Sequence, residues 1–343
     1  MPLQLFDAMA REGFEELLAL HDAKSGMRAL LAIHDSSRGP AFGGIRRWSY
    51  AVNSTALMDA LRLARAMTRK CVLLDLPCGG GKVVMLDQEG LDLKQAYRAI
   101  GRAVERLNGR YYTGPDVNTG PQELGWVSAE TTYCTDPGPA GPGELASCTA
   151  EGVFQGMEAA LLNLDGELDW PRRRVLIQGL GAVGQGLAQR LLERGAKVLA
   201  TEIDPERVST VRATLDVEMV EPGAEMEVVC DVFAPCAMGG ILHDLSVERL
   251  HCKVVAGGAN NPLSRTEHGE RLHERGILFV PDFVINAGAL VRGSVFHLEG
   301  RREPVEEVGA RVRRSVERVL GVAVESDTSP MAAALRLADG EES

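Results

Sequence analysis

Several features that would place the chain in a disulfide-bonded or membrane-bound class are missing. The seven cysteines are an odd number without a CxxC pair, which indicates reduced thiols and offers no metal-binding motif. No apolar run approaches the ~20 residues that span a bilayer. The first residues, Met1-Pro2-Leu3-Gln4, lack the basic and then apolar pattern of a signal peptide. We therefore expect a cytoplasmic protein without a metal ion and without a membrane partner.

Positive charge is scarce as well. Acidic residues (48) outnumber basic ones (37), giving a formal net charge of −11, and no run of Lys or Arg forms a surface for nucleic acid. Most of the basic residues are Arg, because only six are Lys. An amine can lose its proton and a guanidinium cannot, so the few lysines are candidates for proton chemistry.

The 343 residues are 45% hydrophobic and 25% charged, which is typical of a globular protein with about two domains. The first part predicts a mixed arrangement of helices and strands. Its expected elements are a strand over 27–34, a helix from Asn53 to Lys70, a short buried strand over 71–76, a strand over 82–86 and a helix over 92–107. A stretch rich in proline and glycine at 136–147 then predicts a hinge between domains.

The second part alternates between strand and helix patterns, which predicts a parallel sheet with helices on both faces. After a connecting helix over 149–162, the expected elements are 174–178, 182–194, 197–202, 205–213, 228–233, 253–257 and 277–280, and a long helix begins at Pro304. We therefore predict an α/β fold of two domains separated by a cleft. Their bounds are 1–143 and 144–321, and residues 322–343 are expected to pack back on the first domain.

The strongest local motif is the GxGxxG run Gly179-Leu180-Gly181-Ala182-Val183-Gly184, which follows an apolar strand and precedes a helical pattern. In such a turn the first glycine allows the tight bend, the second lets a pyrophosphate approach the backbone, and the third lets the helix pack on the strand. Free N–H groups at the helix start then hold the phosphates. We therefore expect residues 144–321 to be a Rossmann-type, doubly wound dinucleotide-binding domain.

The next expected strand ends in an acidic residue, Glu202, which lies 23 residues after Gly179. A carboxylate at this place accepts hydrogen bonds from the ribose hydroxyls and repels a 2′-phosphate, which favours NAD over NADP as the cofactor. Arg207, a few residues further on, keeps NADP open as an alternative. A glycine-rich turn that binds no ligand is a second alternative.

Three residues of the first domain are candidates for catalysis: Lys70 at the end of a helix, Lys82 after a triple glycine, and Asp116 in a turn-rich segment. If 71–76 and 82–86 are neighbouring strands, both amines lie at one cleft, where one amine binds a substrate carboxylate and the other acts as a base. Each residue also has a purely structural explanation, because a lysine complements a helix end and an aspartate bonds backbone in a turn.

Eight segments follow one another in the order found in a known family. They are GPAFGGIRRW (39–48), ALRLARAMTRK (60–70), GGGK (79–82), LNGRYYTGPDVNT (107–119), QGLGAVG (178–184), DVFAPCAMGG (231–240), AGGANNPL (256–263) and PDFVINAGAL (281–290). With these segments the chain resembles the Glu/Leu/Phe/Val amino-acid dehydrogenase family and is most similar to its leucine-type members. The resemblance covers nearly the whole chain and implies reversible NAD(P)-dependent oxidative deamination of an L-amino acid to a 2-oxo acid and ammonia.

The resemblance also implies roles for individual residues. Lys82 is the base that activates the water attacking the iminium, Lys70 holds the substrate carboxylate, and Asp116 exchanges protons with the substrate nitrogen. The remaining residues contact the two ligands: Gly43, Gly44 and Asn286 the substrate, Thr149 and Asn260 the nicotinamide end of the cofactor, and Ala234 its ribose.

Substrate choice is implied by three positions of this resemblance. Glutamate-type members carry a lysine before the paired glycines, and Phe42 stands there instead, so an anionic side chain would lose water without gaining a partner. Two positions that line the leucine-type pocket, where valine is usual, are Leu290 and Gly293. Since Gly293 widens the pocket while Phe42 and Leu290 fill it, branched aliphatic and aromatic substrates both remain, with the aliphatic class favoured.

Departures from the family leave alternatives open. Ile45, Ala289 and Arg292 stand where the family has other residues, and little follows Ala332 where relatives carry a longer helix, which puts the usual oligomer contacts in doubt. An aromatic-amino-acid dehydrogenase, a specialised biosynthetic relative and a non-catalytic NAD-binding paralogue are therefore alternatives to the main prediction. We still expect a homo-oligomer without a nucleic-acid partner.

Overall fold

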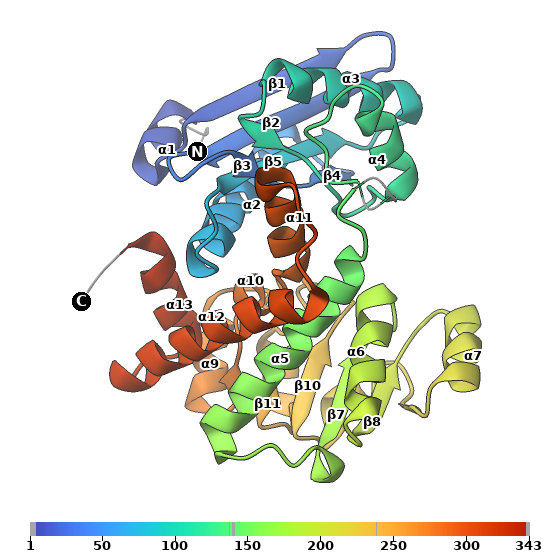
Figure 1. Cartoon of the computed structure of the whole chain (residues 1–343), viewed down its shortest axis with the longest axis vertical. Helices are drawn as coiled ribbons and strands as arrows, with labels where there is room; N and C mark the ends of the chain where they lie inside the picture. The colour runs from blue at the N-terminus through green and yellow to red at the C-terminus, as the bar shows by residue number, and fades with distance from the viewer. Residues whose placement is uncertain (1–4, 137, 139–140, 238, 341–343) are drawn as a thin grey trace. The chain divides into compact units, whose positions relative to one another are not determined.

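The computed structural model describes residues 5–136, 138, 141–237 and 239–340 and divides into two compact units. Unit 1 consists of residues 1–143 and 293–302, and unit 2 of residues 144–292 and 303–343 (Figure 1). Each unit contains its own sheet, which confirms the expected two-domain α/β fold. Residues 1–4 and part of the expected hinge, namely 137, 139 and 140, lie outside the described residues.

In the described residues, unit 1 is built on a six-stranded sheet. Its elements are α1 (Leu5–Glu12), β1 (Glu16–Asp22), β2 (Met27–Asp35), β3 (Ala41–Phe42), β4 (Ile45–Trp48), α2 (Asn53–Leu73), β5 (Gly79–Leu86), α3 (Leu93–Arg106), β6 (Tyr111–Tyr112) and α4 (Pro121–Ser128). The strands follow the order β1-β2-β5-β3-β6, and β4 pairs with β5 further along the edge that β3 occupies. β2 is antiparallel to β5, whereas β3 and β4 run parallel to it.

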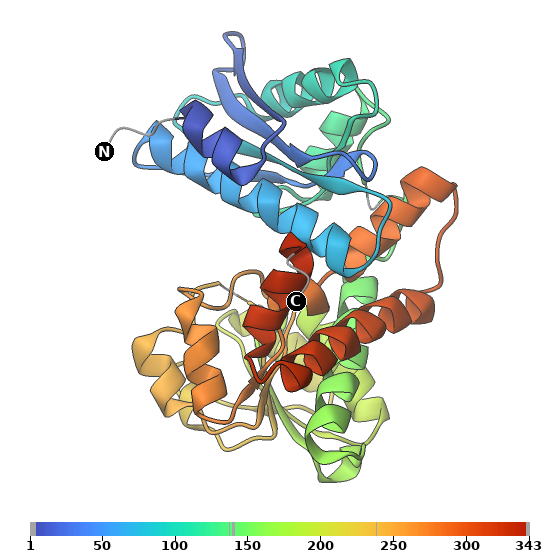
Figure 2. The same cartoon turned by 90° about the vertical axis from the view of Figure 1, so that its left-hand side faces the viewer.

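Helices cover both faces of this sheet (Figure 2). On one face α3 and α4 contribute Tyr97 and Leu124 to an apolar core. On the other face α2 packs through Ala60 and Ala64 near Val84 of β5. β5 is therefore a central strand that is buried along most of its length.

The expected strand over 71–76 does not form, because α2 continues into this segment. Cys71 lies three residues after Thr68 on the buried face of the helix, so the apolar run extends the helical pattern. Gly80 of β5 then allows close packing, since a Cβ added there would lie 2.1 Å from the backbone nitrogen of Thr68. The end of α2 therefore rests directly on β5, and this contact brings together the elements that carry the two candidate lysines.

In the described residues, unit 2 is built on a six-stranded sheet whose strands all run parallel. Its elements are α5 (Leu145–Asp165), η1 (Trp170–Arg172), β7 (Arg174–Gln178), α6 (Ala182–Glu193), β8 (Lys197–Thr201), α7 (Pro205–Thr214), β9 (Glu218–Met219), η2 (Glu225–Glu227), β10 (Val232–Pro235), α8 (Asp244–Arg249), β11 (Val254–Val255), α9 (Glu267–Glu274), β12 (Leu278–Phe279), α10 (Asp282–Ile285), α11 (Gly288–Glu299), α12 (Val305–Glu325) and α13 (Pro330–Asp339). The strand order is β12-β11-β10-β7-β8-β9. From β7 the chain adds β8 and β9 on one side of the sheet and then β10, β11 and β12 on the other, so the order switches between β7 and β10. Such a switch point is where doubly wound sheets bind dinucleotides, at the carboxyl ends of the strands.

The C-terminal part of the chain differs from what the sequence led us to expect. We expected residues 322–343 to return to the first domain, but α13 contacts α9 and β12 of unit 2. Gly269 of α9 permits this contact, because a Cβ there would lie 3.0 Å from the side chain of Met331. The segment that belongs to unit 1 is 293–302, which includes the end of α11. None of the described helices is both long and apolar enough to cross a membrane.

Candidate active site

The GxGxxG turn of unit 2 joins β7 to α6 and is built by contacts that only glycine allows. Gly179 has a φ of +92°, and a Cβ there would lie 2.5 Å from the Cβ of Ala237. A Cβ on Gly184 would lie 2.1 Å from the carbonyl oxygen of Gly179, so the third glycine lets the helix start against the strand. No atom of the described residues lies within 4 Å of a Cβ placed on Gly181. Packing in the fold therefore does not require a glycine at the middle position.

The start of α6 is arranged to receive an anion. Gly181 is the N-cap residue and offers no side chain to the N–H groups of the first turn, which Ala182 and Val183 begin. Leu180, immediately before, is fully buried, and its N–H points instead to Glu202. Uncapped N–H groups and the positive end of the helix dipole bind phosphate groups, so these residues fit the pyrophosphate of a dinucleotide.

Glu202 follows β8 and is held from several sides. Its Oε2 accepts hydrogen bonds from the N–H of Leu180 at 2.8 Å and from Nη1 of Arg207 at 3.0 Å. Its Oε1 accepts from the N–H groups of Ile203 and Asp204, at 2.8 and 3.0 Å. Burial acts to raise the pKa of Glu202, but these hydrogen bonds outweigh it and lower the pKa below its ordinary value. An ionised, fixed carboxylate therefore lies at the end of the second Rossmann strand.

Further cofactor candidates gather near the same turn. A Cβ on Gly258 would lie 2.7 Å from Cγ1 of Val183, which places the segment that leads to Asn260 beside the first turn of α6. Asn286 is buried and donates from Nδ2 to Oδ1 of Asn260 at 2.9 Å. The structure thus joins the expected nicotinamide residue and the expected substrate residue by a hydrogen bond within unit 2.

The other two cofactor candidates of unit 2 are small and buried. Thr149 lies on α5 and donates from Oγ1 to the carbonyl oxygen of Leu145 at 3.1 Å. Gly288 packs beside it, since a Cβ there would lie 2.8 Å from the Cα of Thr149. Ala234 is fully buried on β10, where it pairs with Ile177 of β7, close to the point where the strand order reverses. Neither residue supplies a charged group.

In unit 1 the two residues expected to move protons form a buried ion pair. Lys82 Nζ on β5 contacts Oδ2 of Asp116, and each side chain is only 7% exposed. Oδ1 of Asp116 accepts a hydrogen bond from the N–H of Val117 at 2.7 Å. Arg46 of β4 is a second cation, with its Nε 3.4 Å from Oδ2 of Asp116. Burial acts to raise the pKa of Asp116, but the charges of Lys82 and Arg46 outweigh it and hold that pKa well below its ordinary value.

Paired glycines bring these strands and turns together. A Cβ on Gly43 would lie 1.8 Å from the carbonyl oxygen of Gly81, and one on Gly44 would lie 2.3 Å from that of Pro115. Gly43 and Gly44 also separate β3 from β4, which pair with successive parts of β5. The two glycines therefore let the Lys82 strand and the Asp116 turn approach each other. Lys70, near the end of α2, is half-buried in the same unit.

Aromatic rings surround the position that the resemblance assigns to substrate choice. The ring of Phe42 stacks on Tyr112 with centroids 4.8 Å apart and an interplanar angle of 4°. The ring of His297 lies 4.7 Å from Tyr112, and its Nε2 is 3.1 Å from Oγ1 of Thr135. A Cβ on Gly293 would lie 3.0 Å from Cγ2 of Thr135. Thr135 therefore packs beside Gly293 within unit 1, and Leu290 lies half-buried on the same helix.

Sequence reasoning missed Arg46, together with Thr135 and His297. Arg46 and Arg47 are adjacent on one strand, and alternation along a strand places one on each face. A sequence pattern alone does not say which of the two faces Asp116, because that depends on the register between β4 and β5.

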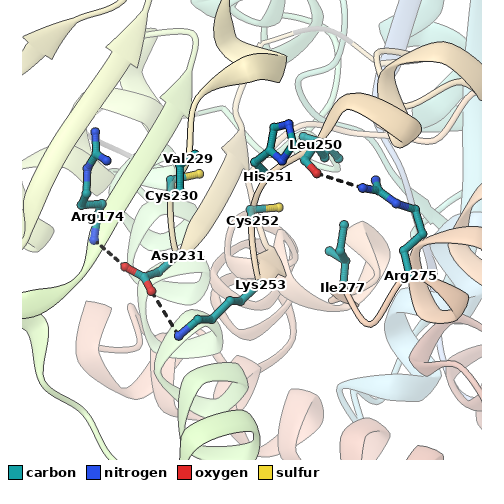
Figure 3. A pocket seen from close by; sticks show the side chains of 10 residues that line it. All are labelled: Arg174, Val229, Cys230, Asp231, Leu250, His251, Cys252, Lys253, Arg275 and Ile277. Atoms are coloured by element: carbon teal, nitrogen blue, oxygen red, sulfur yellow. Dashed lines mark hydrogen bonds and ion pairs between the residues drawn. The ribbon is translucent and has the colours of Figure 1, made fainter.

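A pocket of about 440 Å³ lies elsewhere in unit 2 (Figure 3). It is lined by residues at the amino ends of β7, β10, β11 and β12, such as Arg174, Asp231 and Lys253. Figure 3 shows the Asp231 carboxylate between the backbone N–H of Arg174 and the Lys253 amine, with contacts of 2.9 and 3.5 Å. The glycine turn follows the carboxyl end of β7, so this pocket lies at the opposite edge of the sheet from that turn.

A doubly wound sheet with a GxGxxG turn, in a chain that also buries a lysine–carboxylate pair, defines a dinucleotide-dependent dehydrogenase. Two family descriptions match the chain: "Glu/Leu/Phe/Val dehydrogenase, dimerisation domain" over residues 17–133, and "Glutamate/Leucine/Phenylalanine/Valine dehydrogenase" over residues 201–326. The chain belongs to this family of NAD(P)-dependent amino-acid dehydrogenases and is an oxidoreductase.

Individual relatives cover most of the chain. A leucine dehydrogenase from Thermoactinomyces intermedius is 40% identical over 292 residues, 84% of this chain and 80% of that protein. A leucine dehydrogenase from Geobacillus stearothermophilus is 38% identical over 340 residues, 98% of this chain and 93% of that protein. Among solved structures, the L-tryptophan dehydrogenase from Nostoc punctiforme superposes with a TM-score of 0.84 at 34% identity and covers 98% of both chains.

Proposed function

We propose that the protein is an NAD-dependent dehydrogenase that reversibly deaminates an apolar L-amino acid, with branched-chain substrates favoured, to the 2-oxo acid and ammonia. The observation that carries this proposal is the buried Lys82–Asp116 ion pair, which provides a base and a carboxylate for proton transfer. The similarity to leucine dehydrogenases over most of the chain supports the choice of substrate class.

Each residue of unit 1 has a defined task in this proposal. The ammonium of Lys70 binds the substrate carboxylate, Lys82 acts as the base for the attacking water, and Asp116 exchanges a proton with the substrate nitrogen. Oδ2 of Asp116 contacts Nζ of Lys82 and lies 3.4 Å from Nε of Arg46. The base and the carboxylate are therefore close enough for a proton to pass between them.

Unit 2 supplies the cofactor site in this proposal. When bound, the nicotinamide ring accepts the hydride that leaves the substrate Cα. The turn from Gly179 to Gly184 holds the pyrophosphate, while Thr149, Ala234 and Asn260 contact the nicotinamide half. Asn286, hydrogen-bonded to Asn260, orients the substrate beside that ring.

NAD rather than NADP is proposed because of Glu202. An ionised carboxylate at the end of β8 accepts hydrogen bonds from ribose hydroxyls and repels a 2′-phosphate. Arg207 is the nearby cation that would attract such a phosphate, but its Nη1 is 3.0 Å from the Glu202 carboxylate. The pairing favours NAD because the Glu202 carboxylate already neutralises the charge of Arg207.

The side-chain preference follows from apolar residues. Phe42 is 3% exposed and offers no partner to an anionic side chain, so glutamate is disfavoured. Leu290 and Gly293 are the further pocket residues of this proposal. An aromatic substrate is the second candidate, because the stacked rings of Phe42 and Tyr112 show that aromatic rings pack together in this part of unit 1.

We also propose that the protein works in the cytoplasm as a homo-oligomer without nucleic-acid or membrane partners. The seven cysteines are free thiols, which suits a reducing compartment. The family description that matches residues 17–133 names a dimerisation domain, which supports assembly through unit 1.

The test is a panel of L-amino acids incubated with NAD and, in parallel, with NADP. We expect NADH absorbance with leucine, valine and isoleucine, weaker signals with phenylalanine and tryptophan, and none with glutamate. Turnover mainly with aromatic substrates would favour the second candidate. NAD binding without turnover on any apolar amino acid would contradict the proposal and favour a non-catalytic paralogue.

A further inference from the structure

A row of alternating charges extends from the proposed proton-transfer pair to α2 of unit 1. Asp116 lies between Lys82 and Arg46, and Arg46 in turn lies between Asp116 and Asp59 of α2. The Arg46 side chain is 13% exposed and that of Asp59 is 14% exposed, so neither charge is screened by bulk water. A buried row of this kind is stable only if every charge has its partner.

The geometry gives Arg46 two contacts with the Asp116 carboxylate. Its Nε is 3.4 Å from Oδ2, and its Nη2 is 3.5 Å from Oδ1. On the far side its Nη1 is 3.3 Å from Oδ2 of Asp59. Asp59 is itself held by the hydroxyl of Tyr50 at 2.6 Å and by Arg62 at 2.7 Å. Arg46 therefore reaches the carboxylate from a fixed position.

Asp116 needs this second cation when the base is working. In the proposed reaction Lys82 must exist without its proton for part of the cycle, and a neutral amine no longer balances the carboxylate charge. A guanidinium keeps its charge at every pH at which the protein is folded. Arg46 is thus the permanent counter-ion of Asp116, while Lys82 is the variable one.

We infer that Arg46 is a positioning residue for the reaction: anchored by Asp59, it holds the Asp116 carboxylate in place and ionised while the neighbouring lysine releases its proton. This inference rests on the proposed function. Arg46 touches neither substrate nor cofactor in this scheme and acts only through Asp116. Arg46 thus supplies the positive charge that keeps Asp116 balanced when Lys82 loses its proton.

The groups that face Asp116 within unit 1 decide the sign of the expected pH effect. They are Lys82 of β5, Arg46 of β4, Asp59 of α2, Tyr50 after β4 and Tyr111 of β6. Burial raises the pKa of both tyrosines far above the working range, so both stay neutral. Removing Arg46 therefore takes one positive charge out of the cluster while both carboxylates, Asp59 and Asp116, remain. The Lys82–Asp116 pair then binds its proton more tightly.

The test compares the pH profiles of kcat for deamination in the full-length wild type, Arg46→Gln, Arg46→Lys and Arg47→Gln. In Arg46→Gln we expect the rising limb, which reports proton release from the pair, to move to higher pH by about one unit. At neutral pH this shift corresponds to a loss of about tenfold in kcat. Arg46→Lys should recover most of the wild-type profile, because it restores the charge.

Arg47→Gln is the matched control. Arg47 is the next residue of β4 and supports the same turn, with Nε 3.4 Å from the carbonyl oxygen of Asn118, but its ion pair is with Asp87 at 2.9 Å. If Arg46 only held the turn, both variants would lower kcat without moving the profile. That result, or an Arg46→Gln profile that superimposes on the wild type, would overturn the inference and leave the proposed function intact. A wild type without turnover would overturn the proposed function, and the role of Arg46 with it.

Discussion

The glycine turn of unit 2 and the charged pair of unit 1 are built in different ways. The turn is made by six consecutive residues, 179–184, which pack on β7 and against segments that follow β8, β10 and β11. The pair combines Lys82 of β5 with Asp116 from a later turn, and Arg46 from a third segment completes it. The first site depends on the backbone shape that its glycines allow, and the second depends on a balance of charges. The two should therefore fail differently when they are altered.

The largest effect is expected at the charged pair. Lys82→Ala removes the proposed base, and we expect kcat to fall by about 10³-fold or more, because general bases contribute factors of this size. The dissociation constant for NAD, measured by fluorescence titration, should stay unchanged, since the dinucleotide turn belongs to unit 2.

Lys94→Ala is the control for this variant. Lys94 is an exposed lysine on α3 of the same unit, and its removal should leave both kcat and the affinity for NAD unaltered. A different result would be that Lys82→Ala loses NAD binding while the enzyme that still binds NAD turns over normally. That result would contradict the assignment of catalysis to the charged pair and of NAD binding to the glycine turn.

Changes in the glycine turn should have the opposite effect and lower the affinity for NAD rather than kcat. Gly184→Ala places a Cβ against the carbonyl oxygen of Gly179, so we expect a loss of about 1–3 kcal/mol in the free energy of unfolding. Gly181→Ala meets no described atom and has a φ of −67° that alanine accepts, so stability should stay the same. Its affinity for NAD should nevertheless fall by about tenfold, or about 1.4 kcal/mol.

Urea unfolding and NAD titration of the same two samples separate these outcomes. If Gly181→Ala binds NAD like the wild type, the middle glycine does not face the cofactor. The assignment of the turn as a pyrophosphate site would then be wrong.

A similar effect is expected when the negative charge beside the glycine turn is removed. Glu202→Gln keeps the shape of the side chain but removes its negative charge and releases Arg207 from its ion pair. The ratio of kcat/KM with NAD to kcat/KM with NADP should fall by about tenfold, because a repulsion on the order of 1 kcal/mol or more disappears.

Glu206→Gln serves as the comparison, since Glu206 is exposed in the first turn of α7 and should leave the ratio unchanged. An unchanged ratio in Glu202→Gln would show that this carboxylate only holds the turn, through its bonds to the N–H groups of Leu180, Ile203 and Asp204.

The same contrast explains how much of the molecule the sequence revealed. The turn and its sheet were predictable because glycine spacing and strand–helix alternation act over short distances, and β7, α6 and β8 lie where they were expected. The fold of unit 1 was harder, because the apolar run after Lys70 suits a strand or a helix and only packing on Gly80 decides between them. The lysines and Asp116 were recognisable from their motifs.

Arg46 and Thr135 were not recognisable, because their roles depend on distant partners. Arg46 faces Asp116 through the register of β4 on β5, in which Ile45 lies opposite Val83. Thr135 fills the space beside Gly293, more than a hundred residues away in sequence. Contacts of this kind leave no local signal in the sequence.

The smallest effect is expected at His297, where protonation should change the free energy of unfolding. Burial lowers the pKa of His297 to about 4, against about 6.5 in an unfolded chain. Above pH 6.5 the ring is neutral in both states and costs nothing. Between pH 6.5 and about 4 only the unfolded chain takes up the proton, so this residue lowers stability as the pH falls.

His297→Phe keeps a ring beside Tyr112 but cannot bind a proton. Its urea midpoint should therefore fall less than that of the wild type when the pH is lowered from 7 to 4.5. Comparing the two proteins at each pH cancels the carboxylates that they share. His21→Gln, which changes an exposed histidine on β1, should show no such change between the two pH values. If His297→Phe and the wild type lose stability in parallel, the imidazole takes up its proton inside the folded unit. The aromatic stack would then tolerate a buried positive charge without an oppositely charged partner in the described part of the chain, whereas the charges around Asp116 each have one.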